Sequence, residues 1–109
     1  MMTLYEIAEK LELETIHETG GDAPVSGCYI GDLLSLVMSR AQEGEIWLTV
    51  QTNINIIAVA VLTGVACVIV TEGMEIPEET VQKAAEQDVA LYRSPLSTFA
   101  LAQTVSGLL

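Results

Sequence analysis

The stretch EGEIWLTVQTNINIIAVAVLTGVACVIVTEG, residues 43–73, decides the fold because two short apolar runs flank a longer apolar segment. The runs Glu45–Val50 and Ala66–Thr71 have the length and the β-branched residues of buried strands. Between them, Asn55–Thr63 has the length of a helix, and Gly64 supplies a stop after it. The order strand, helix, strand is typical of a βα unit in a largely parallel sheet.

The same alternation continues on both sides of this stretch. At the start of the chain, Thr3 and Glu6 have the spacing of a capping box. The expected fold class is α/β: a small three-layer domain with a mainly parallel central sheet of four to five strands flanked by helices. The other predicted strands lie near Leu13–Glu18, Val25–Tyr29 and Val89–Arg93, and the other predicted helices near Thr3–Leu11, Asp32–Gln42, Pro77–Gln87 and Ser97–Ser106.

Length and charge limit the possible functions. With 109 residues, half of them hydrophobic, the chain is long enough for one core, so we expect a single domain over residues 1–109. Fifteen carboxylates against four Lys and Arg residues give a formal net charge of −11. Nucleic acids and anionic membranes bind clusters of cations. The sequence therefore excludes both as partners.

The sequence also indicates where the protein is located. The first residues, MMTLYE, lack the cationic and apolar regions of a secretory signal, so we expect a cytoplasmic protein. The apolar run Ile54–Val70 is shorter than the roughly 20 residues of a spanning helix. Thr63-Gly64 interrupts that run, so no membrane insertion is expected.

The usual catalytic motifs are missing from this sequence. There is no phosphate-binding loop of the Walker type, no G-x-G-x-x-G fingerprint and no H-E-x-x-H pair. Cys28 and Cys67 are far apart in the sequence, and we expect both to be buried thiols. His17 is the only histidine. We therefore expect no enzyme activity, no catalytic residue, no metal site and no cofactor.

The predicted helix Asn55–Thr63 is apolar all round, and such a helix must be covered on every side. A subunit interface is one way to cover it, and complete burial within one chain is the other. We predict a homodimer, since closed two-fold dimers are the commonest soluble oligomers. The predicted interface residues are Ile56, Ile57, Val59 and Ala60.

Polar residues follow the predicted strands, at the edge where open parallel sheets bind ligands. The structural alternative is that they cap helices and form turns. We predict a binding site for a partner protein, a small metabolite or a nucleotide at this rim. Its predicted residues are Gln51, Thr52, Asn53 and Asn55 after one strand and Thr71, Glu72 and Gly73 after the next.

These segments also carry a family resemblance. The stretches Val25–Ser35, Ile46–Ala60 and Cys67–Gly73 resemble the DRTGG domain family, in particular its small stand-alone members related to the N-terminal domain of HPr kinase. The resemblance implies a regulatory domain without chemistry of its own. The eponymous motif is altered: Thr52-Asn53 stands where the family has Asp-Arg, which removes an obvious phosphate contact, and Thr71-Glu72-Gly73 stands where it has Thr-Gly-Gly.

The predicted function is a non-catalytic, homodimeric regulatory or adaptor domain that binds its ligand or partner at the rim. One alternative is a structural subunit that docks on a larger complex, which analogy with the family's relatives suggests is a redox complex. A less favoured alternative is a small-molecule enzyme that uses Asn53, Asn55, Thr71 and Ser94 of the rim.

Overall fold

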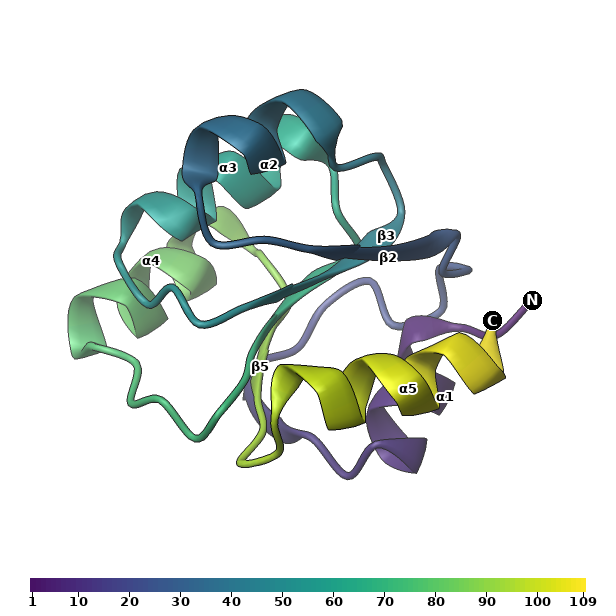
Figure 1. The fold of residues 1–109 in the computed structure, drawn as a ribbon. Coiled ribbons are helices and arrows are strands. Elements are labelled where there is room, and N and C mark those ends of the chain that lie inside the picture. The colour runs from purple at the N-terminus through teal and green to yellow at the C-terminus, as the bar shows by residue number, and fades with distance from the viewer.

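The computed structural model describes all 109 residues and has three layers, with a five-stranded sheet between two layers of helices (Figure 1). The strand order is β1-β5-β4-β3-β2, and only β1 runs antiparallel to its neighbour. The predicted α/β class and the mainly parallel sheet are confirmed. The elements are α1 (Leu4–Lys10), β1 (Glu14–His17), β2 (Gly27–Ile30), α2 (Leu34–Arg40), β3 (Glu45–Thr49), α3 (Asn55–Thr63), β4 (Cys67–Val70), α4 (Glu78–Gln87), β5 (Leu91–Arg93) and α5 (Thr98–Leu108).

Two hydrophobic cores hold the layers together, one on each face of the sheet. Helices α1 and α5 pack on one face, and α2, α3 and α4 pack on the other (Figure 1). Successive residues of β3 point to opposite faces, so Ile46 and Leu48 enter the first core and Trp47 enters the second. The Trp47 indole N–H donates to the carbonyl of Gly31 at 2.8 Å, which satisfies its one polar group.

The ends of several helices follow the local signals in the sequence. At α1 the predicted capping box is present: the Thr3 hydroxyl accepts from the Glu6 N–H, and the Glu6 carboxylate accepts from the Thr3 N–H. Helix α3 ends at Gly64, whose φ of 75° lies in the left-handed region that glycine tolerates. These local signals mark where the helices begin and end.

The packing of α3 corrects the predicted interface. All four predicted interface side chains, Ile56, Ile57, Val59 and Ala60, are buried in the core of their own chain. Those residues are therefore not free to contact another subunit, and the assignment was wrong. The same helix exposes Val61 and Leu62 to solvent. None of the helices combines the length and hydropathy that a membrane crossing requires.

Paired substitutions on α3 test this orientation. Ile57→Ala removes a fully buried side chain and should lower the free energy of unfolding by about 2–5 kcal/mol. Leu62→Ala, at a side chain of the same helix that is 71% exposed, should change it by no more than about 0.5 kcal/mol. Urea unfolding of both variants measures the difference. Equal losses would mean that the buried face of α3 is misassigned.

Candidate functional site

The predicted rim lies at the edge where the parallel strands end. Strand β3 ends at Thr49 and β4 at Val70, so the two predicted groups of residues follow neighbouring strands. The N–H of Thr71 donates to the carbonyl of Thr49 at 2.9 Å, which holds the start of the second group beside the end of β3. The two parts of the rim are therefore continuous.

The loop after β3 supplies the exposed part of the rim. The Asn53 side-chain oxygen accepts from the N–H of Asn55 at 2.8 Å and so satisfies a backbone donor at the start of α3. The carbonyl of Thr52 accepts from the Thr80 hydroxyl at 2.8 Å, which ties the loop to α4. The Thr52 hydroxyl, the Asn53 amino group and the Asn55 amide make no hydrogen bond within the chain. These three side chains can bind a ligand or a partner.

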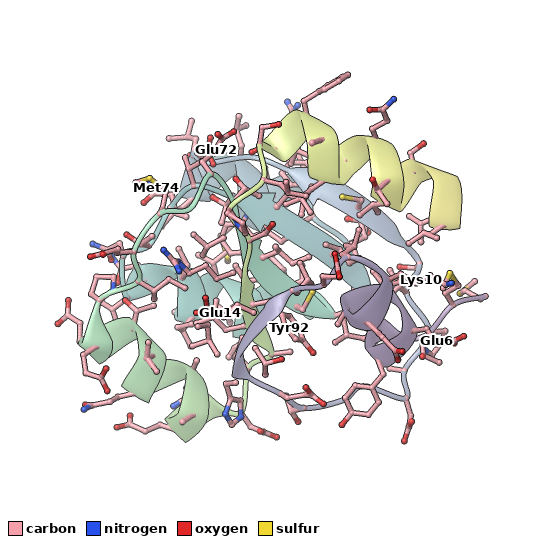
Figure 2. The ribbon with its side chains drawn as sticks, turned by 90° about the horizontal axis from the view of Figure 1, so that it is seen from below. Glu6, Lys10, Glu14, Glu72, Met74 and Tyr92 are labelled. Carbon is pink, nitrogen blue, oxygen red and sulfur yellow. The ribbon has the colours of Figure 1, made fainter.

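The loop after β4 is more structural than predicted. Thr71 is fully buried, and its hydroxyl lies 2.6 Å from that of Thr98. Glu72 accepts from the Thr98 N–H at 3.0 Å and so caps the first turn of α5 (Figure 2). Glu72 also has a φ of 63°, a left-handed conformation that is uncommon for a residue with a side chain. Thr71 and Glu72 therefore hold α5 against the end of β4.

Sequence reasoning missed Asp32, which organises the end of β3. Its carboxylate accepts from the Thr49 hydroxyl at 2.8 Å and from the Val50 N–H at 2.9 Å. The Gln51 amide donates to the Asp32 carbonyl at 3.1 Å, so Gln51 also serves to fix the loop. Asp32 follows β2 at the same edge as the predicted residues. The rule that binding residues follow the carboxyl ends of parallel strands located the other residues, and it could have found Asp32 as well.

Arg93 is the cation at this edge, and each of its three guanidinium nitrogens already donates a hydrogen bond within the chain. Its guanidinium donates to the carbonyls of Met74 at 2.7 Å and Gly73 at 2.8 Å, and it pairs with Glu14 at 3.2 Å. These bonds tie the loop after β4 to the edge strand β1 (Figure 2). The rim therefore offers hydrogen-bonding groups but no unengaged cation for a phosphate.

The only histidine lies away from the rim. Strand β1 is antiparallel, so His17 at its end lies at the opposite edge of the sheet. Its Nε2 is 2.8 Å from Asp88, and Thr19 donates to the second carboxylate oxygen of Asp88 at 2.9 Å. The bonds from His17 and Thr19 lower the pKa of Asp88 below its ordinary value. His17 thus pairs with Asp88, at the carboxyl end of α4, and not with a rim residue.

Both cysteines are free thiols that burial makes unreactive. They lie on the same face of the sheet, with Ile46 of β3 between their strands. Burial raises the pKa of Cys28 to about 11 and raises that of Cys67 further. A thiol that stays protonated is a poor nucleophile and a poor metal ligand. No group of three potential His, Cys, Asp or Glu ligands comes together anywhere in the chain.

The fold and the rim define a small parallel α/β domain with hydrogen-bonding loops at the ends of its strands. The family model described as "DRTGG domain" matches residues 6–108, and the chain belongs to this family. No curated protein is similar enough to the chain to count as a match.

One solved structure has the same fold at low sequence identity. It is the crystal structure of the CBS and DRTGG domains of the regulatory region of Clostridium perfringens pyrophosphatase, in complex with the activator diadenosine tetraphosphate. The TM-score is 0.71 and the sequence identity is 17%. The similarity covers 94% of this chain and 45% of the other, so this chain corresponds to less than half of that structure.

Variants of Asp32 test its role in ordering the rim. Asp32→Ala removes the partner of the Thr49 hydroxyl, which is nearly buried, and should destabilise the fold by about 1–3 kcal/mol. Asp32→Asn keeps one side-chain oxygen and should lose much less. Thermal unfolding of the two variants provides the comparison. If Asp32→Ala is as stable as Asp32→Asn, the carboxylate does not organise the rim.

Proposed function

We propose that this DRTGG domain is a non-catalytic regulatory module that binds a polar, weakly charged ligand, or a polar loop of a partner protein, at the rim. The observation that carries the proposal is the set formed by the exposed Asn53 and Asn55 and the half-buried Thr52, whose side chains have unused hydrogen-bonding groups. Membership of the DRTGG family supports it. The regulatory region of the pyrophosphatase, in which a DRTGG domain stands beside CBS domains, supports it as an analogy.

Charge favours a neutral ligand over a polyphosphate. Each guanidinium nitrogen of Arg93 is engaged within the chain, Glu72 adds a carboxylate to the rim, and the net charge is −11. A polyphosphate would meet repulsion without a compensating cation. A nucleoside keeps the hydrogen-bonding groups of the base and the ribose and drops the phosphates. We therefore expect the rim to prefer neutral polar molecules.

Titration of the isotope-labelled domain with adenosine and with ADP tests the rim. Adenosine should shift the amide signals of at least two of Thr52, Asn53, Asn55 and Thr71, and ADP should shift them less at the same concentration. Asn55→Ala should weaken the adenosine shifts, because its exposed amide is unengaged within the chain. Gln103→Ala, an exposed amide on α5, is the matched control. Shifts confined to Leu4–Glu18 would rule the site out.

We also propose that the domain forms a homodimer, through a different surface from the buried side of α3. Helices α2 and α3 lie side by side, and neither contains a carboxylate (Figure 1). Contact between two copies with a net charge of −11 requires such a surface, because facing carboxylates would repel. Large apolar side chains of this layer are exposed, namely Leu33, Leu36, Met38, Val61 and Leu62.

Sedimentation equilibrium tests the dimer. At micromolar concentration the wild-type chain should give about twice its mass of 11.7 kDa. Leu62→Glu, at a side chain that is 71% exposed, should shift the equilibrium to monomer because it places a charge in the contact. Phe99→Glu, at an equally exposed position on α5, should leave the dimer intact. A wild-type monomer would contradict the proposal and leave the α2–α3 surface to a different partner.

A further inference from the structure

A hollow in the surface lies at the edge of the sheet opposite the rim. It is open to solvent and has a volume of about 700 Å³. Four of its lining residues, Ser26, Gly44, Ala66 and Ala90, each directly precede one of the parallel strands. The hollow therefore runs along the starts of β2, β3, β4 and β5. It shares no residue with the rim.

Small side chains create this hollow. The turns that lead into β3, β4 and β5 each contribute a glycine or an alanine to the lining of the hollow. Gly44 and Gly64 have φ values of 83° and 75°, so a larger residue at these turns would be strained as well as obstructive. Apolar side chains of α3 and of the segments that lead into β4 and β5 add to the lining, among them Val61, Val65 and Val89. The resulting surface suits a small apolar side chain.

Both charged side chains that line the hollow are negative, and Met1, which carries the α-amino group of the chain, also lines it. Glu43 and Asp88 contribute carboxylates, and no Lys, Arg or His side chain lines it. Glu43 makes no side-chain hydrogen bond within the chain, so its carboxylate is free. Asp88 already accepts from His17 and Thr19, but a carboxylate has about four acceptor positions and can accept further bonds. Each of these two carboxylates can therefore accept hydrogen bonds from a cation of a bound segment.

We propose that this hollow, which we call the amino-edge hollow, docks a segment of a partner protein in which Lys or Arg lies next to small apolar residues. The apolar residues contact the Ala and Val lining, and the cations meet Glu43 and Asp88. Charge complementarity selects this occupant over a second copy of the chain, whose net charge is also −11. An open hollow cannot enclose most of a free small molecule, as small-ligand sites do. A segment held by a larger partner does not need that enclosure.

Short blocked peptides provide the test, with binding followed by the amide signals of the full chain in low-salt buffer. The probe is acetyl-Lys-Ala-Val-Lys-amide. One control has Glu in place of both Lys residues, and another has Gly in place of Ala and Val. The first peptide should shift the signals of Gly44, Gly64, Ala66 and Ala90, and the Glu peptide should not. The Gly peptide should bind more weakly, because it lacks the apolar contact.

Matched variants separate the hollow from general attraction to an acidic protein. Glu43→Gln should weaken the first peptide about two- to fivefold, as expected for one exposed ion pair. Glu79→Gln, an equal change of charge on α4 outside the hollow, should not. Ala23→Trp should block the hollow, whereas Ala85→Trp, on the exposed side of α4, should leave binding unchanged.

Three results would overturn the proposal. One is the absence of any shift with the first peptide. Another is equal binding of the Gly peptide, which would show attraction by charge alone. The third is an equal loss of affinity in Glu43→Gln and Glu79→Gln. Because the hollow and the rim lie at opposite edges of the sheet, each of these results leaves the proposed function of the rim to its own test.

Discussion

The rest of the structure depends on the burial of β3 and β4 on both faces. Neither strand reaches water on either side, and every residue from Ile46 to Thr49 and from Cys67 to Val70 is buried. A parallel sheet of this kind is stable only when helices cover both of its faces. Helices α1 and α5 provide one cover, and α2, α3 and α4 provide the other. Most polar groups consequently collect at the two edges where strands and loops meet, and the buried Tyr92 hydroxyl, which has no hydrogen-bond partner, is an exception.

The sequence predicted the elements well because their signals are local. The capping box at Thr3 and the stop at Gly64 depend only on near neighbours, and both were found where predicted. The buried side of α3 could not be predicted. Nearly every position of this helix is apolar, so the sequence shows no contrast between an apolar and a polar face. Only the packing of α3 against Trp47 and the neighbouring helices selects the side that holds Ile56 and Ile57.

The rim was predicted in position but not in detail. The order of strands and helices located it, because parallel strands end at the same edge. Which of its side chains remain free depends on partners that are distant in sequence, such as Thr98 for Thr71 and Asp32 for Thr49. Glu72 and the side-chain oxygen of Asn53 do what the structural alternative predicted, because each accepts a hydrogen bond from a backbone N–H at the start of a helix. The side-chain groups of the loop after β3 that make no hydrogen bond within the chain are the ones left for the proposed binding.

The bonds of Arg93 show that a cation at the edge of the sheet need not form an anion site. It lies at the rim, where a phosphate would be expected, yet its guanidinium donates to two carbonyls of the loop after β4 and pairs with Glu14 of β1. Release of Arg93 to a phosphate would leave those carbonyls without their donor and loosen the loop. At the position where the family resemblance places Arg, Asn53 satisfies a backbone donor of α3 instead. Both residues thus stabilise the rim from within, and this leaves neutral hydrogen-bonding groups as the ones that the proposed binding would use.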